Sequence, residues 1–158
     1  MQAVPPLVLK ALREHPFQLL DLAKKLPDGQ YSQRLHPSAR SIHEILVHML
    51  DAEEFWVRHV LQGGPRTHRD PAALPTPDAL ERTWRPIREE TVAYLQSLKE
   101  DDLTRPVPLP WNPTSSRTVQ EILWHLVTHE FHHKGQVCTR LAMAGVQVPD
   151  LDVISREE

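Results

Sequence analysis

The sequence has few glycines, almost no cysteine and no long hydrophobic run. Its 158 residues include five glycines and one cysteine. So few glycines argue against a β fold built from tight hairpins and against a glycine-rich nucleotide loop. A single cysteine excludes an internal disulfide framework and a cysteine-rich zinc site. Because no run of about 18 apolar residues occurs, we expect no membrane-spanning helix and no membrane partner.

Strong charge of either sign is also missing. The formal net charge is −3, and 25% of the residues are charged while 40% are hydrophobic. This balance lacks the basic surface that binds nucleic acids, so we expect no nucleic-acid partner. The first residues carry no basic segment before an apolar one, so we expect a cytoplasmic protein. Length and composition predict one globular domain over residues 1–158.

Proline and histidine are abundant, with 15 and 10 copies. The prolines divide the chain into four stretches with the apolar spacing of amphipathic helices. A Ser/Thr-x-x-Glu capping box opens two of them, at Ser41 and at Thr118. No alternating strand pattern competes, so the sequence predicts an all-α four-helix bundle with long proline-rich connections and a polar C-terminal tail at 146–158. The expected helices cover 7–26, 42–62, 77–99 and 119–144.

Two histidines of the fourth helix fall on its apolar face. On a helical wheel, His129 and His133 lie in the middle of the apolar stripe, whereas His125 lies at its edge and His132 outside it. A buried imidazole without a partner is costly. Residues i and i+4 project from the same side of a helix, so both rings can reach one metal ion. The alternative is that each ring forms its own hydrogen bonds in the core.

A third ligand must come from another helix, and His48 is the candidate. His129 and His133 lie about 16 and 22 Å from the start of their helix, and His48 lies about 21 Å from the end of its own. These levels match if the two helices are antiparallel, which requires a crossover between the second and third helices. The connection 63–76 can span roughly 45 Å when extended. The sequence therefore predicts an up-down-down-up bundle.

Two segments together resemble a known family. SIHEILVHMLDAEEFW, followed much later by ILWHLVTHEFHHKGQV, is similar to the DinB-like (YfiT-type) family of metal-dependent four-helix bundles, with Lys134 where arginine is common. The resemblance covers nearly the whole chain. It implies an up-down-down-up bundle, often a homodimer, with His48, His129 and His133 as ligands of one divalent ion. Zinc or nickel is the first expectation for that ion, and manganese or iron the next.

The resemblance also implies an activity. Members transfer a low-molecular-weight thiol such as bacillithiol or mycothiol to an electrophile, so we expect a metal-dependent thiol S-transferase with a small thiol and an electrophile as partners. A metal ion can lower the pKa of a bound thiol or water and hold the anion. Two alternatives stay open: a metal-dependent hydrolase, and a non-catalytic, stress-associated dimeric bundle that only binds metal.

A rival motif overlaps the pair of histidines. Residues 129–133 read H-E-x-x-H, the zincin protease signature, in which Glu130 would be the general base. No sheet edge is expected to hold an extended peptide, and no third ligand follows at a persuasive position, so we do not expect a protease. Glu130 remains a candidate catalytic base for another reaction, and the alternative is a solvated glutamate on the helix face.

Other residues near the expected site have two interpretations each. Asp51, one turn from His48, could orient that imidazole or be a solvated carboxylate. His125 is expected in the core or behind the ligands. Arg140 could bind a substrate carboxylate or extend to the rim. Trp111, in the proline-rich connection, could cover the mouth of the site, while the other tryptophans suit the core or a dimer contact. Cys138 faces away from the ligands and is expected to pack.

Overall fold

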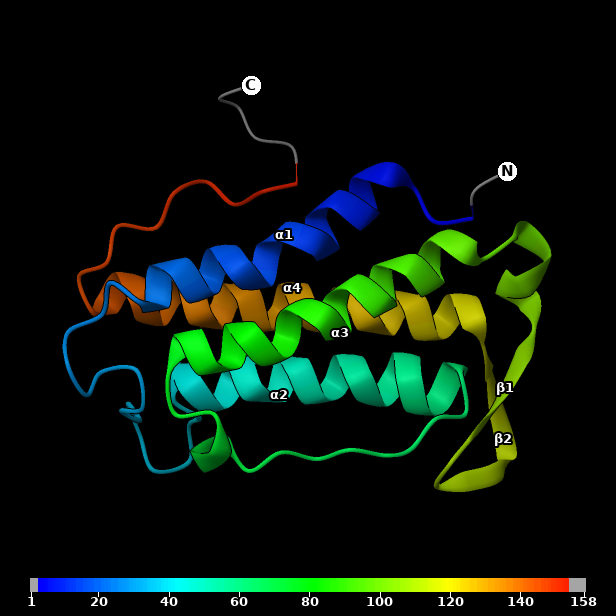
Figure 1. Cartoon of the computed structure of the whole chain (residues 1–158), viewed down its shortest axis with the longest axis horizontal. Coiled ribbons are helices and arrows are strands. Elements are labelled where there is room, and N and C mark those ends of the chain that lie inside the picture. The colour runs from blue at the N-terminus through cyan, green and yellow to red at the C-terminus, as the bar shows by residue number, and fades with distance from the viewer. Residues whose placement is uncertain (1–2, 154–158) are drawn as a thin grey trace.

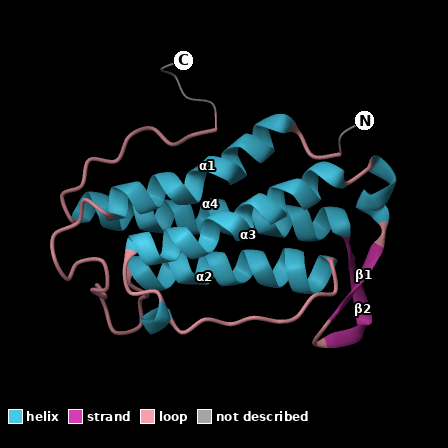
Figure 2. Cartoon of the chain, in the orientation of Figure 1, coloured by secondary structure: helices cyan, strands magenta, loops and turns pink. Residues whose placement is uncertain are grey.

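Four long helices and a small sheet make up the molecule (Figures 1 and 2). The computed structural model describes residues 3–153. In Figure 1, α2 and α3 run in one direction while α1 and α4 run in the other, which is the up-down-down-up order expected from the long crossover. No helix of the described residues is long and apolar enough to cross a membrane. The helices are α1 (Pro6–Ala23), α2 (Ile42–Glu54), α3 (Pro77–Ser97) and α4 (Val119–Met143).

Capping boxes begin the two helices that carry the histidine ligands. The hydroxyl of Ser41 accepts a hydrogen bond from the Glu44 backbone N–H, and the Glu44 carboxylate accepts one from the Ser41 N–H. Thr118 and Glu121 repeat the arrangement at the start of α4. Each box satisfies two N–H groups that the helix leaves free. Both predicted helix starts, at 42 and at 119, are confirmed.

The second helix changes type after Glu54. Residues Phe55–Leu61 form a π-helix instead of continuing as α-helix, so the expected helix 42–62 consists of two elements. Gly63 ends it with a φ of +71°, and a Cβ on Gly64 would lie 2.9 Å from the Arg58 carbonyl oxygen. The glycine pair is therefore required where the chain turns into the crossover. The crossover then runs alongside α2 and includes a short 3₁₀ turn, η2 (Pro71–Ala73).

The expectation of an all-α fold is wrong at residues 106–118. After a 3₁₀ turn, η3 (Glu100–Thr104), strands β1 (Pro106–Leu109) and β2 (Asn112–Thr118) pair antiparallel. Prolines are tolerated because both strands of a two-stranded sheet are edge strands, which need not donate every N–H. Val107 and Leu109 are buried, which fixes the hairpin against the end of the bundle.

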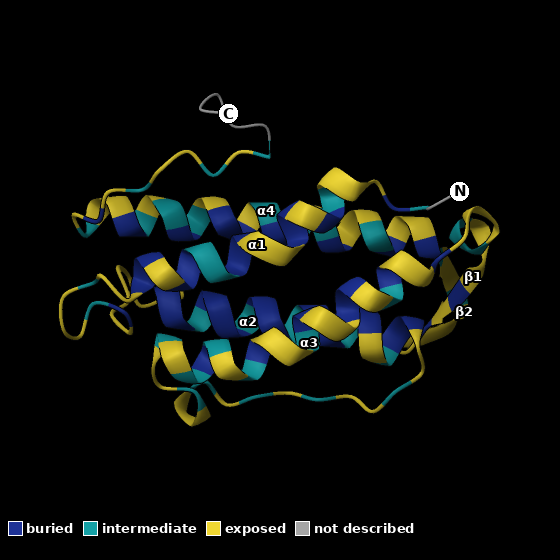
Figure 3. Cartoon of the chain, turned by 45° about the horizontal axis from the view of Figure 1, so that its top comes forward, coloured by how far each residue is buried: buried dark blue, intermediate teal, exposed yellow. Residues whose placement is uncertain are grey.

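The buried residues, most of them apolar, lie where the four helices face one another (Figure 3). The segment after α4 contributes to it, contrary to the expected polar tail. Val146 is buried, Val148 and Leu151 pack against the core, and the Lys134 ammonium donates a hydrogen bond to the Leu151 carbonyl. Residues 146–153 therefore cover the bundle, and the remainder of the expected tail, 154–158, lies outside the described residues.

Candidate metal centre

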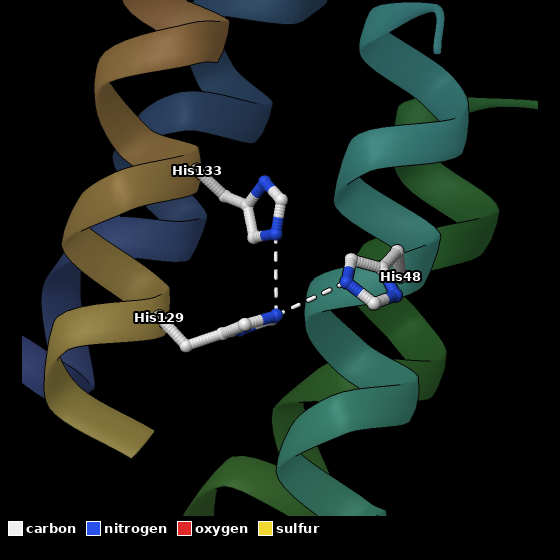
Figure 4. A group of neighbouring side chains, drawn as sticks. All are labelled: His48, His129 and His133. Carbon is white, nitrogen blue, oxygen red and sulfur yellow. Dashed lines mark hydrogen bonds between the residues drawn. The ribbon is translucent and has the colours of Figure 1, made fainter. Parts of the chain in front are cut away.

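Three imidazoles meet between α2 and α4 (Figure 4). The Nε2 atom of His129 lies 3.0 Å from that of His48 and 3.2 Å from that of His133. His48 comes from α2, and the other two come from successive turns of α4. Within residues 3–153 this is the one group of three or more histidine, cysteine or acidic side chains placed closely enough to hold a metal ion.

The donor set fits a divalent ion better than a set of hydrogen bonds. The Nε2 atoms of three neutral imidazoles face one another here, and a nitrogen without a proton presents a lone pair. One proton on the Nε2 of His129 could form a hydrogen bond to His48 or to His133, but not to both. Zinc–nitrogen bonds of about 2.0–2.1 Å in a tetrahedral site correspond to nitrogen–nitrogen separations of about 3.4 Å. The observed separations of 3.0 and 3.2 Å are close to that value. The three ligand atoms all lie within 4.8 Å of one another, so the cluster could hold a metal ion.

Electrostatics keep these rings in the neutral form that binds metals. Burial, and after it the positive charge of Arg40, lower the pKa of His48 to about 4. Burial lowers the pKa of His129 to about 3, with His133 and His48 as the next causes. The pKa of His133 is also lowered, again mainly by burial. At neutral pH all three side chains are therefore uncharged ligands rather than imidazolium ions.

Gln136 orients one of the ligands. His133 Nδ1 lies 2.9 Å from the side-chain oxygen of Gln136, which can only accept, so the ring carries its proton on Nδ1 and leaves Nε2 free. The Gln136 amide nitrogen lies 2.9 Å from Nε2 of His132, which is exposed. Sequence analysis missed this role of Gln136, although its spacing of three residues from His133 on a helix is a usable signal.

Glu130 follows His129 in the chain but is directed towards α1 and α3, where its partners His15 and Arg88 lie, rather than towards His48 on α2. It is buried, and the Arg88 guanidinium donates to both Glu130 and Glu53 over 2.8 Å. The expected solvated glutamate is therefore wrong. The buried stripe of α4 passes through Glu130 and Lys134, while His129 lies half-buried at its flank. Because its partner Arg88 belongs to α3, Glu130 faces away from the three Nε2 atoms, unlike the glutamate of a zincin.

Asp51 and His125 occupy positions different from those expected. The Asp51 carboxylate accepts hydrogen bonds from the backbone N–H and the side chain of Arg69, each with a length of 3.1 Å. It also lies 3.0 Å from Nδ1 of His68. It therefore attaches the crossover to α2, and within the described residues it has no hydrogen bond to His48. His125 is exposed rather than in the core, and its ring centroid lies 5.7 Å from that of His129.

An aromatic cluster adjoins the centre through His125. The Trp56 ring lies 4.8 Å from that of His125, and Trp111 lies 5.8 Å from Trp56 and 6.2 Å from Phe55. Trp111 is at the turn of the β-hairpin and is 61% exposed. The hairpin therefore places its tryptophan beside the π-helix, three ring contacts from the candidate ligand His129.

Arg140, Cys138 and two tryptophans are the remaining residues that the sequence analysis singled out. Arg140 lies half-buried on α4, and its guanidinium donates to the Gln136 carbonyl over 3.1 Å. Cys138 is half-buried against the core, which agrees with its expected packing role. Of the other tryptophans, Trp84 is fully buried in the core, whereas Trp124 is 64% exposed.

Comparisons with known proteins agree with this architecture. The chain is 27% identical over 141 residues to Protein DinB of Bacillus subtilis (strain 168), covering 81% of this chain and 78% of that protein. It is 30% identical over 92 residues to the uncharacterized protein YizA of the same organism, but there it spans only 57% of the relative's length.

A solved structure shares the fold. The crystal structure of a DinB-like protein from Bacillus subtilis, YjoA, superposes with a TM-score of 0.67 at 22% identity, covering 91% of this chain and 96% of that one. The family model described as the DinB family matches residues 1–158. With the helix order and the histidine cluster already established, these matches show that the chain belongs to the DinB family.

Proposed function

We propose that the protein is a divalent-metal-dependent transferase that joins a low-molecular-weight thiol, of the bacillithiol or mycothiol kind, to an electrophile. His48, His129 and His133 are the proposed ligands of one ion, with zinc or nickel ahead of manganese or iron. The observation that carries the proposal is the convergence of three uncharged Nε2 atoms at 3.0 and 3.2 Å. Residues 1–158 are proposed to act as one domain in the cytoplasm.

The donor set suits thiol chemistry. Three neutral imidazoles leave a divalent ion its full charge, and such an ion stabilises the thiolate form of a thiol in an open position. In the reaction, the thiol sulfur forms a bond to the electrophilic carbon. The leaving group departs with the electrons of the broken bond, and the thiol proton passes to solvent. The protein needs no cysteine nucleophile, which is consistent with a half-buried Cys138 whose thiol pKa is raised by burial.

The aromatic cluster is the proposed place for the electrophile. The exposed indole of Trp111 packs against the rings of Phe55 and Trp56. Trp56 in turn contacts His125, whose ring lies next to that of the candidate ligand His129. An exposed aromatic surface of this kind binds flat apolar groups. Trp111 would therefore cover the electrophile on one side of the centre, as the sequence analysis anticipated.

Metal analysis and a reaction panel test the proposal. We expect about one equivalent of a divalent metal in purified protein, and conjugate formation when a thiol panel is mixed with an aromatic electrophile such as 1-chloro-2,4-dinitrobenzene. Metal without conjugation would favour the non-catalytic metal-binding bundle, and hydrolysis products without thiol would favour the hydrolase. Protein that binds no divalent metal at micromolar concentrations would refute all three.

We also propose a homodimer. The exposed Trp124 lies on the wall of an apolar cavity of about 340 Å³, next to Leu123, Val127 and the N-terminal Val8. Apolar surface of this kind often marks a contact between subunits. Sedimentation at micromolar concentrations should give twice the mass of the chain, and a monomer at all concentrations would contradict the assembly.

A further inference from the structure

A cavity lies beside the start of α2 and the end of α4. Its volume is about 260 Å³, and Ile42, Leu35, Gln30 and Arg140 lie on its wall. Ile42 precedes His48 by six residues and Arg140 follows His133 by seven. Because α2 and α4 run antiparallel (Figure 1), six residues before His48 and seven after His133 both lead to the same end of the helix pair. At a rise of 1.5 Å per residue, the cavity therefore lies about 10 Å along the two helices from the candidate metal centre.

Arg140 brings an unsatisfied positive group to this cavity. One of its terminal nitrogens donates to the Gln136 carbonyl, while its Nε is buried and has no hydrogen-bond partner. Within residues 3–153, Arg140 forms no ion pair, and no acidic residue lies on the wall of the cavity. A buried donor without an acceptor is costly, and a guanidinium is matched best by a carboxylate that accepts two hydrogen bonds.

The Arg140 guanidinium lies towards the histidines, and a second positive residue lies at the same end of the helix pair. The hydrogen bond to the Gln136 carbonyl draws the Arg140 side chain back by one helical turn, towards His133. Arg40, an exposed residue two positions before α2, brings a second positive charge to the end of the helix pair where the cavity lies. Two positive side chains, Arg140 and Arg40, therefore lie at the end of the helix pair where the cavity is.

We propose that the cavity binds a carboxylate group of the thiol substrate, with Arg140 as the binding residue and Arg40 adding positive charge. This inference rests on the proposed function, because the sulfur of the same molecule would occupy the metal centre. The expected thiol substrate is therefore an anionic one, in which several bonds separate the sulfur from a carboxylate. The apolar walls from Ile42 and Leu35 suit the carbon chain between the two groups.

Cobalt-loaded protein and a matched pair of thiols test the inference. The sulfur-to-cobalt absorption band reports thiolate binding, and 6-mercaptohexanoate differs from 6-mercaptohexanol only at the far end. We expect the acid to bind about tenfold more tightly than the alcohol, which corresponds to one charge-assisted hydrogen bond. Arg140→Gln should abolish this preference without changing the affinity for the alcohol. Arg140→Lys should retain part of it, and Arg117→Gln, on the exposed hairpin, should retain all of it.

A second measurement does not depend on the metal. Hexanoate, which has no sulfur, should shift the Nε resonance of Arg140 in the metal-free protein and leave that of Arg117 unchanged. Equal affinities for the acid and the alcohol, or a preference that survives Arg140→Gln, would overturn the inference. Failure to take up cobalt would count against the proposed function instead, and the hexanoate shift would still decide whether the cavity binds a carboxylate.

Discussion

The Nδ1 of His133 lies 2.9 Å from the side-chain oxygen of Gln136, and this contact sets which nitrogen of the ring faces His129. Without it, the imidazole could rotate or take its other tautomer. Hydrogen bonds behind a ligand typically change metal affinity about 10–100-fold. We therefore expect Gln136→Leu to weaken zinc binding by that factor in competition with a chelating dye. Gln120→Leu, on the exposed face of α4, is the matched control, and equal affinities for the two variants would contradict the role of Gln136.

The assignment of ligands predicts a sharp contrast between neighbouring histidines. His133→Ala should lose the bound metal and retain its helical circular dichroism, because α4 keeps its cap and its buried stripe. His132→Ala and His125→Ala should keep most of the metal, since both side chains are exposed and neither Nε2 atom belongs to the cluster. Metal content after gel filtration measures the effect. Complete loss in His125→Ala together with full retention in a His48→Ala variant would refute the assignment.

Local sequence signals predicted the helix starts and the ligand cluster. Ser41 and Thr118 cap their helices through contacts three residues away, which a sequence displays directly. His48 was paired with His129 and His133 by helix rise alone, and the Nε2 atoms do meet. These features depend on spacing along the chain and on one choice, the antiparallel order of α2 and α4.

Features that depend on tertiary partners were missed. Glu130 was expected on the solvated face because its partner, Arg88, lies 42 residues away on another helix. Proline at 106, 108 and 113 concealed a hairpin that is held by packing of Val107 and Leu109 rather than by strand propensity. The apolar residues after 145 are too sparse for a periodic pattern, so their packing against the bundle could not be predicted from the sequence.

Burial of His15 predicts a pH dependence of stability. His15 is 4% exposed, and its pKa is lowered to about 4 by burial, then by Lys134 and Arg88, against a small opposing effect of Asp152. The unfolded chain takes up this proton near pH 6.5 and the folded chain only near pH 4. As the pH falls from about 6.5 to about 4, the free energy of unfolding should therefore decrease by up to about 3 kcal/mol, and below pH 4 this contribution should stay constant.

The control for this prediction is a His15→Gln variant, which keeps a polar side chain but does not titrate. Urea unfolding between pH 4 and pH 7.5 should show a shallower loss of stability in the variant than in the parent protein. The other histidines contribute equally to both proteins, so the difference isolates His15. Parallel curves would show that the His15 pKa is not lowered.

Arg88 is expected to be essential for stability, because it is the shared partner of two buried carboxylates, Glu53 and Glu130. Arg88→Met would leave both carboxylates without their positive partner, with only the Trp84 indole N–H still donating to Glu53, and removing one partner of a buried ion pair costs about 3–5 kcal/mol. Urea unfolding at pH 7 measures the loss. Arg85→Met, which alters an exposed arginine on the same helix, should change stability by less than about 1 kcal/mol. Adding Glu53→Gln and Glu130→Gln to Arg88→Met should recover part of the loss.

Trp111 is expected to matter for substrate binding more than for folding. The indole is 61% exposed and rests on Phe55 and Trp56 at the hairpin turn, so its removal opens no interior cavity. Trp111→Ala should keep its metal and unfold within a few degrees of the parent protein. It should raise the KM for 1-chloro-2,4-dinitrobenzene several-fold, because stacking on an aromatic ring contributes about 1 kcal/mol. The KM for a small aliphatic electrophile such as iodoacetamide should not change.

Trp124→Ala removes an equally exposed tryptophan outside the aromatic cluster and is the matched control. If both variants raise the KM alike, or if Trp111→Ala affects the two electrophiles equally, Trp111 does not bind the electrophile.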